Sequence, residues 1–405
     1  MRKIKERIIF CGMLISMIMI AAAIHRSAYA SSKNYDGLKK AVIEAYKQYE
    51  TEVDVRKYNL YKNADNVGIK KVMTEVINQT PYLFYTGQSF SKIILVNTNQ
   101  ITKIELTYSK AYIKSNGVVD KQKIAKTRTK INNAVKKAMK CVRPGMTHLE
   151  KAMVLHDYII SNTEYNDSSS RENRISECGV FLEHKANCQG YSLAYGILME
   201  KAGVPVDYVI SDKMSHMWNL IKIGGRWYNV DVTWDDPIDS NSKKDQYGLV
   251  RHEYFMCSTK KFRSDDHYSF SASAATDRSY DNKYWRRVDS AFQYRSGKWF
   301  YLSNAGITKR SELSSGSGAV LYKTDGKAMV RYNDDKYYFI MKNGIYMYNA
   351  GKNSVRLIWK TSSKYGGSYY VTQIKYQNNH IYYRVLKGSA HKNGSIKVKK
   401  NGLAA

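Results

Sequence analysis

Two short stretches decide the fold of this chain: residues 187–198, NCQGYSLAYGIL, and residues 215–231, SHMWNLIKIGGRWYNVD. They contain Cys188, His216 and Asp231, in that order. A thiol, an imidazole and a carboxylate are the components of an acyl-transfer site. The imidazole takes the proton of the thiol, the carboxylate orients the imidazole, and the thiolate attacks a carbonyl carbon. The three residues gain this meaning only if the local structure brings them together.

Residues 189–201 have the pattern of a helix. Leu193, Ile197 and Leu198 recur at helical spacing, and Gly203 followed two residues later by a proline is typical of a helix end. Cys188 therefore lies at the predicted helix N-terminus. Unpaired backbone N–H groups and the positive end of the helix dipole favour a thiolate there, and they can also donate to an oxyanion.

Residues 216–233 have the pattern of a hairpin with the turn Gly224-Gly225, because glycines tolerate the positive φ that two-residue turns require. A two-residue loop pairs residues whose numbers add up to 449, so that Trp218 faces Asp231. His216 and Asp231 then lie on one face of the hairpin as diagonal neighbours. A three-residue loop would put them on opposite faces, since a slip of one residue inverts a strand.

These motifs resemble the core of the transglutaminase-like superfamily, which has a papain-like fold. The resemblance covers residues 146–257 and is carried by the motifs at 188–192, 203–205, 216–219 and 227–235. It implies that Cys188 is the nucleophile, His216 the base and Asp231 the orienting carboxylate. In one departure, the family often has glycine where this chain has Ala186, which is still a small residue.

Other residues near these motifs have weaker predicted roles. Trp218 shares a strand face with His216 and is predicted to shield the site from water. Trp218 and Gln189 are the two residues predicted to bind substrate or shield the site. Asp235, Asp236 and Asp239 form an acidic loop, which is interpreted as a turn, with a calcium site as the alternative. His156 is predicted to be structural. No metal and no organic cofactor are expected.

The N-terminus has the pattern of a secretory signal peptide. Basic residues at 2–7 precede an apolar run at 8–24, and Ala28-Tyr29-Ala30 is a small-x-small cleavage motif. Cleavage after Ala30 predicts a secreted or cell-surface protein without an integral membrane span, and an uncleaved anchor is the alternative.

The chain is strongly basic, with a formal net charge of +30, which falls to about +26 without residues 1–30. Outside a cell the usual polyanions are wall polymers and anionic glycans, so we interpret the charge as attraction to such a surface. No nucleic-acid-binding motif accompanies the charge, and no specific nucleic acid is expected. The alternative is that the charge serves only solubility.

Four cysteines follow residue 30: Cys141, Cys178, Cys188 and Cys257. An even number suggests disulfides, but a catalytic Cys188 leaves three. One bridge that includes Cys178, or no bridge, both remain open, because a chain of this length does not need disulfides to fold.

The segments on either side of the core differ in character. Helices are predicted at 36–49, 69–77, 120–141 and 148–162, the last opened by a Thr147–Glu150 capping box, and strands at 92–96 and 101–108. Aromatic runs at 297–301, 335–339 and 379–383 form a weak repeat, which predicts antiparallel meanders like propeller blades. The aromatic rows are interpreted as cross-strand packing, with sugar stacking as the alternative.

The sequence thus predicts an α+β protein. It would consist of a signal peptide (1–30), an N-terminal α/β accessory region (31–145), a papain-like transglutaminase core (146–270) and a tyrosine-rich β module (280–405). The expected activity is acyl transfer from an amide of a protein or peptide substrate through a Cys188 thioester. The acceptor could be water or an amine. A catalytically inactive surface-binding protein on the same scaffold is the alternative.

Overall fold

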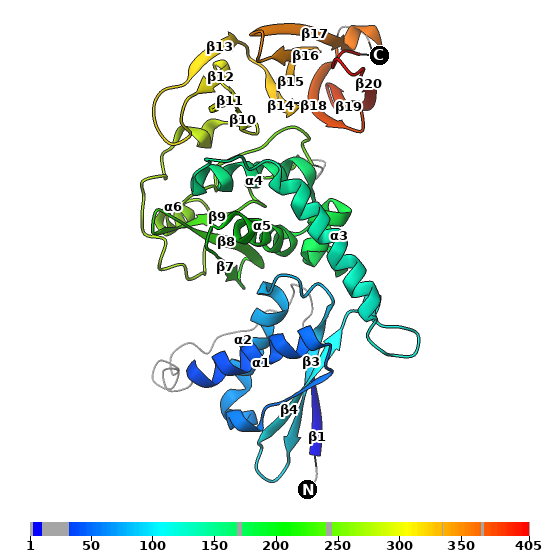
Figure 1. The fold of residues 1–405 in the computed structure, drawn as a ribbon, viewed down its shortest axis with the longest axis vertical. Coiled ribbons are helices and arrows are strands. Elements are labelled where there is room, and N and C mark those ends of the chain that lie inside the picture. Colours follow the sequence, from blue (N-terminus) through cyan, green and yellow to red (C-terminus); the bar gives the residue numbers. More distant parts are fainter. Residues whose placement is uncertain are drawn as a thin grey trace. The chain divides into compact units, whose positions relative to one another are not determined.

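The computed structural model of the chain describes residues 3–9, 32–167, 172–239, 245–333, 335–365 and 368–404 (Figure 1). The chain divides into two compact units. The first comprises residues 1–135 and 167–183, and the second comprises residues 136–166 and 184–405. The predicted core (146–270) lies mostly in the second unit, which also contains the predicted β module (280–405), while the boundary between the units falls inside helix α3 (Lys121–Met139).

The first unit is built on a four-stranded antiparallel sheet with the order β1-β3-β4-β2. Its strands and main helices are β1 (Lys3–Ile9), α1 (Ser32–Gln48), β2 (Glu52–Asp54), α2 (Lys62–Gln79), β3 (Thr86–Leu95) and β4 (Ile101–Tyr108). The apolar positions predicted to form one face of α2 are all buried: Ile69, Val72, Met73, Val76 and Ile77. Helices α1 and α2 and strands β3 and β4 overlap the helices and strands predicted from the sequence, whereas β1 and β2 were not predicted.

Strand β1 includes residues that the sequence analysis assigns to a signal peptide. It pairs with β3, with Lys3 opposite Leu95. Most of the predicted apolar run and the cleavage motif lie outside the described residues. The leader and its removal therefore stay predictions.

The second unit begins with the helices and the sheet that carry the candidate site. They are α4 (His148–Asn162), α5 (Cys188–Ala202), β7 (Val206–Ser211), β8 (His216–Ile223), β9 (Arg226–Val230) and α6 (Thr259–Ser264). The predicted capping box opens α4, because the Thr147 side chain accepts from the Glu150 N–H and the Glu150 carboxylate accepts from the Thr147 N–H. The Tyr195 hydroxyl of α5 donates to the Ala152 carbonyl of α4 over 3.2 Å, which joins the two helices.

The β8–β9 hairpin has the register that a two-residue loop requires. Ile223 pairs with Arg226, and the ladder continues to Asn219 opposite Val230. Gly224 and Gly225 have φ values of 57° and 81°, in the region that a primed two-residue turn needs. The predicted register is confirmed, and Asp231 follows one step beyond the ladder.

The C-terminal part of the second unit consists of three small antiparallel sheets, each paired in sequential order. The sheets contain β10 (Gln293–Arg295), β11 (Lys298–Ser303), β12 (Gly306–Arg310) and β13 (Ala319–Lys323), then β14 (Lys327–Arg331), β15 (Lys336–Met341), β16 (Gly344–Asn349) and β17 (Ser354–Lys360), then β18 (Tyr370–Gln377), β19 (His380–Lys387) and β20 (Ala390–Lys397). The three aromatic runs of the repeat form the second strand of each sheet. The predicted antiparallel meanders are confirmed.

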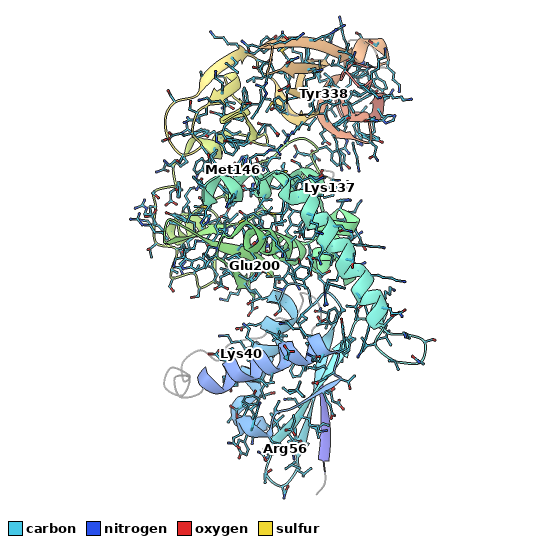
Figure 2. The ribbon with its side chains drawn as sticks, in the orientation of Figure 1. Lys40, Arg56, Lys137, Met146, Glu200 and Tyr338 are labelled. Atoms are coloured by element: carbon cyan, nitrogen blue, oxygen red, sulfur yellow. The ribbon has the colours of Figure 1, made fainter. Side chains whose placement is uncertain are left out.

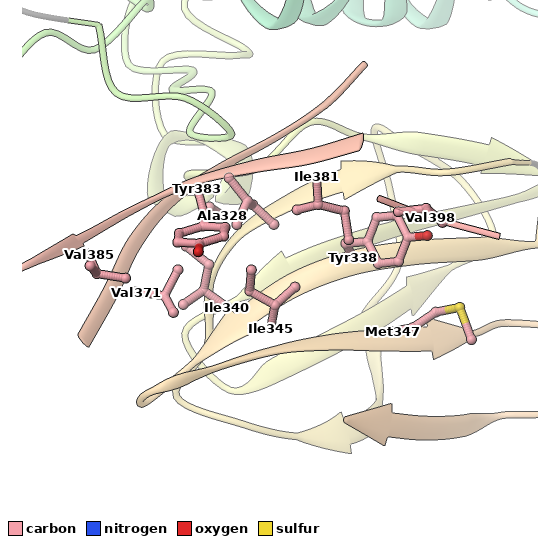
Figure 3. Close-up of a cluster of buried hydrophobic side chains, with 11 residues drawn as sticks. Ala328, Tyr338, Ile340, Ile345, Met347, Val371, Ile381, Tyr383, Val385 and Val398 are labelled. Atoms are coloured by element: carbon pink, nitrogen blue, oxygen red, sulfur yellow. The ribbon is translucent and has the colours of Figure 1, made fainter. Parts of the chain in front are cut away.

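The aromatic rows of these sheets pack inside the protein. Tyr338 and Tyr383 belong to a buried cluster with aliphatic side chains of β15, β16, β18 and β19 (Figures 2 and 3). Trp299 of β11 and Phe339 of β15 are fully buried, whereas Tyr382 is 42% exposed. The packing interpretation of the repeat is confirmed for these buried rings.

Two further properties bear on the sequence analysis. None of the helices within the described ranges is long and apolar enough to cross a membrane. Cys141, Cys178, Cys188 and Cys257 are all free thiols, and Cys178, the predicted member of a disulfide, is buried.

Helix α5 comes unusually close to β7 at Gly196. An added Cβ there would lie 2.1 Å from the Tyr208 hydroxyl oxygen and 2.8 Å from Cζ of the same ring. Although alanine favours a helix by about 1 kcal/mol over glycine, we expect Gly196→Ala to lower the free energy of unfolding by roughly 1–3 kcal/mol, because the tyrosine ring must move. Urea unfolding measures the difference.

The matched control is the same change in a Tyr208→Val background, where the ring that causes the clash is gone. Gly196→Ala should then be neutral or stabilising. Equal losses in the two backgrounds would show that α5 does not pack on β7 through this contact.

Candidate active site

The first side chain of the site is placed by the start of α5. Asn187 is the N-cap residue, and its side chain accepts hydrogen bonds from the N–H groups of Gln189 and Gly190. Cys188 is the first residue of the helix, as predicted, and its own N–H lies outside this cap. An asparagine directly before a helical pattern is a standard cap signal, so the sequence analysis could have identified Asn187.

Hydrogen bonds within the interior fix α5 against β8. The Ser192 hydroxyl lies 2.8 Å from the Cys188 carbonyl and 2.9 Å from the Met217 carbonyl, and Asn219 donates to the Ser192 carbonyl over 3.1 Å. These contacts hold the first turn of the helix against the strand that begins with His216. The thiol and the imidazole therefore come from two elements that are joined next to the site.

The structure brings Cys188, His216 and Asp231 together. Nε2 of His216 lies 2.6 Å from Oδ2 of Asp231. The Cys188 side chain is near enough to the His216 ring to raise its pKa. Because Nε2 of His216 faces Asp231, Nδ1 is the nitrogen left for the thiol. The expectation that His216 and Asp231 meet on one face of the hairpin is confirmed.

The electrostatics of the pair favour charged forms of both groups. Burial by itself disfavours an imidazolium, but the charge of Asp231 and the hydrogen bonds to Asp231 and Cys188 outweigh it and raise the pKa of His216 to about 10. Burial also disfavours the Asp231 carboxylate, but His216 and the hydrogen bonds from His216 and His267 lower the pKa of Asp231 well below its usual range. An imidazolium–carboxylate pair is therefore the stable state at neutral pH.

Aromatic rings surround the imidazole. Trp218 is buried, stacks on His216 with 5.7 Å between ring centroids, and donates from its indole to Asn229. Trp234, which the sequence analysis did not single out, lies 5.4 Å from His216 and is half-buried. Cys188 is 3% exposed and His216 is 7% exposed, so the rings keep most water away from the thiol and the imidazole. Gln189 is half-buried beside Cys188.

The acidic loop turns inward. Asp235 binds Nε2 of His156 at 3.1 Å and also accepts from the Tyr254 N–H at 2.9 Å. Asp236 accepts from the Tyr191 hydroxyl. The carboxylates of Asp235 and Asp236 therefore have protein partners, which fits the interpretation of this segment as a turn.

Besides the His216–Asp231 pair, the second unit contains another buried cluster of hydrogen-bonded side chains, which is centred on Asp157. Oδ1 of Asp157 is 2.9 Å from Nδ1 of His156 and 3.0 Å from Nε2 of His252. Burial lowers the proton affinity of the His156 ring, but hydrogen bonds to Asp157 and Asp235 outweigh it and raise the pKa of His156 to about 9. The expected structural role of His156 is explained by this cluster, which sequence reasoning did not anticipate.

Each of the two clusters, His156–Asp157–His252 and His216–Asp231–His267, contains three groups that could hold a metal ion. A tetrahedral zinc ion with bonds of about 2.0–2.2 Å would keep its ligand atoms about 3.3 Å apart. The N···O separations are 2.6–3.0 Å, which are hydrogen-bond distances. The geometry therefore describes both as hydrogen-bonded clusters.

A cavity of about 210 Å³ lies elsewhere in the second unit. It is lined by residues of α4 between Val154 and Asn162, the segment 245–249 and residues of β10, β14 and β18. Cys188, His216 and Asp231 do not line it. The cavity is therefore separate from the candidate active site.

Comparison with known protein families agrees with the predicted core. Residues 135–232 match the sequence model of the transglutaminase-like superfamily. This range contains Cys188, His216 and Asp231 together with α4, α5 and the β7–β9 sheet. The chain therefore contains a transglutaminase-like domain.

The individual relatives are distant. The chain is 23% identical over 158 residues to the human kyphoscoliosis peptidase and 22% identical over 156 residues to that of Mus musculus. The matches cover 35% and 34% of this chain, and they span only 22% of the length of each relative.

Similar solved structures include a TGase, with 16% identity over 33% of this chain and 41% of that chain and a TM-score of 0.25. Another is the arylamine N-acetyltransferase of Salmonella typhimurium, with 9% identity over 56% of this chain and 84% of that chain and a TM-score of 0.23.

Proposed function

We propose that the protein is a cysteine-dependent enzyme that transfers the acyl group of an amide through a thioester at Cys188. The observation that carries the proposal is the buried His216–Asp231 pair, with 2.6 Å between the two side chains, next to the Cys188 thiol at the start of α5. The match to the transglutaminase-like superfamily supports a cysteine-dependent acyltransferase or peptidase.

In the first half of the reaction, the Cys188 sulfur attacks the amide carbonyl carbon and forms a C–S bond. The carbonyl electrons move to the oxygen, which the N–H of Cys188 at the start of α5 can stabilise. His216, which has taken the thiol proton, gives it to the leaving nitrogen, and the C–N bond breaks. The products are a thioester on Cys188 and a free amine.

In the second half, water or an amine attacks the thioester. His216 removes a proton from the attacking group, the C–S bond breaks, and the thiol is restored with that proton. Water as the acceptor makes the protein a peptidase or amidase, whereas an amine such as a lysine side chain makes it a cross-linking enzyme. Asp231 keeps the imidazole oriented in both halves.

The alternative is a surface-binding protein on an inactive scaffold. The presence of all three side chains of an acyl-transfer site, with His216 paired to Asp231 at 2.6 Å, argues against it. We also propose that the protein is exported and meets anionic polymers at the cell surface, on the basis of its basic charge and its N-terminal pattern.

The proposal predicts that iodoacetamide at neutral pH labels Cys188 much faster than Cys178 or Cys257. Burial raises the pKa of both of these other thiols, and only a thiolate reacts quickly. His216→Ala should slow the labelling of Cys188 by roughly 10–100-fold, and Asp231→Asn should slow it less, since an orienting residue acts through the imidazole. Peptide mass spectrometry measures each site separately.

The matched control is His391→Ala, which removes an exposed histidine of β20 and should leave the rate unchanged. If Cys188 reacted no faster than Cys178 or Cys257, or if His216→Ala had no effect, the acyl-transfer proposal would fail.

Turnover of an amide should decline as pH rises through about 10. The raised pKa of His216 preserves the imidazolium up to that pH, and the leaving nitrogen needs the imidazolium proton.

The proposed attraction to anionic polymers has a separate test on immobilised heparin, which serves as an anionic glycan. The full chain should be retained at 0.1 M salt and released at 1 M, because the screening length falls from about 10 Å to about 3 Å. A neutral dextran resin is the control. Undiminished retention at 1 M salt would contradict an electrostatic attraction.

A further inference from the structure

Asp231 has a second histidine partner. Its Oδ1 accepts from the backbone N–H groups of Thr233 at 2.9 Å and Trp234 at 3.1 Å. Its Oδ2 lies 2.6 Å from Nε2 of His216 and 3.0 Å from Nε2 of His267. Each oxygen of this fully buried carboxylate therefore has two donors, so the carboxylate has little freedom to rotate.

The ring of His267 is held by an aromatic enclosure. Phe262 and Trp234 each lie 4.2 Å from it between ring centroids, and Trp218 and Tyr254 each lie 5.1 Å away. His267 is fully buried. Because two of these rings, Trp218 and Trp234, also contact His216, the two imidazoles share one aromatic environment.

The segment that carries His267 adopts backbone conformations that L-residues rarely take. Asp266 has φ 69° and Ser269 has φ 54°, and such conformations cost free energy that the surrounding structure must supply. The segment is fixed by bonds from the His267 N–H to the Phe262 carbonyl and from the Ser211 hydroxyl to the Tyr268 carbonyl. Strain retained beside a candidate site points to a role there.

The partners of the ring assign its tautomer. Nε2 faces the Asp231 carboxylate, which can only accept, so this nitrogen carries a hydrogen. Nδ1 lies 3.3 Å from the Asp265 carbonyl, a longer contact. His267 is therefore a donor to Asp231.

We propose that His267 is a positioning residue of the acyl-transfer site: it holds Oδ2 of Asp231 in line with His216, so that the imidazole stays oriented towards Cys188. The role rests on the proposed function. His267 takes no part in proton or acyl transfer, because the Asp231 carboxylate stands between it and His216.

The test compares His267→Gln with His267→Leu in the full chain. The glutamine amide can place a donor where Nε2 stands, whereas leucine cannot, and both variants lose the same ring from the aromatic enclosure. Labelling of Cys188 by iodoacetamide should slow by about 10-fold in His267→Leu, and by no more than in Asp231→Asn, because His267 acts only through that carboxylate. It should stay within about threefold of wild type in His267→Gln.

Phe262→Leu is the packing control, since it opens the enclosure and keeps the His267–Asp231 bond. It should lower the melting temperature without slowing the labelling as His267→Leu does. The pH profile of labelling adds a further readout: the profile of His267→Leu should approach that of Asp231→Asn, whereas a purely structural role would leave its form unchanged. Equal rates in the glutamine and leucine variants would overturn the proposal.

A second measurement remains valid if Cys188 proves unreactive and the proposed function fails. NMR of the chain with isotope-labelled histidine follows the titration of His216 directly. His216 should titrate at lower pH in His267→Leu than in wild type, because the carboxylate that raises its pKa is no longer held in line with the ring, and His267→Gln should resemble wild type. An unchanged titration in His267→Leu would show that His267 does not act through Asp231.

Discussion

Three aspartates in the turn at residues 231–236 point into the protein, and each one binds a different part of the second unit. Asp231 binds His216 and His267, Asp235 binds His156 of α4, and Asp236 binds Tyr191 of α5. A further bond from the Asp235 N–H to the Asp231 carbonyl closes the turn itself. The position of the candidate base therefore depends on a turn that is anchored at once to both helices beneath the site. A buried carboxylate is tolerated only when its lone pairs are satisfied, so each of these bonds constrains the others.

The same constraint extends to the β-rich part of the unit. Asp157, which binds His156 and His252, also accepts from the Phe292 N–H at 2.6 Å, and His252 contacts the Val288 carbonyl at 2.9 Å. The segment that leads into β10 is thereby joined to the helix that supports the turn. These contacts help to join α4 and the C-terminal sheets in one compact unit. The segment before the C-terminal sheets therefore contributes to the framework of the site.

The parts of the site that could be predicted from the sequence are those specified by local chemistry. The Gly224-Gly225 turn determines the register, the register determines that His216 and Asp231 share a face, and the Gly203 signal ends the helix that starts at Cys188. His267 could not be found in this way, because it stands 36 residues after Asp231 in a segment without a periodic pattern. The partners of Asp157 are further still, with His252 95 residues and Phe292 135 residues away. Contacts between such distant segments follow from tertiary packing, which spacing along the chain does not reveal.

The central claim is that Cys188 accepts an acyl group with the help of His216, and the most direct measurement is the intact mass of the protein after brief exposure to a p-nitrophenyl ester. The account predicts a gain equal to one acyl group, located on Cys188, absent in Cys188→Ala and formed slowly in His216→Ala. Acylation of Cys188→Ala at the wild-type rate, or an adduct confined to other residues, would contradict it.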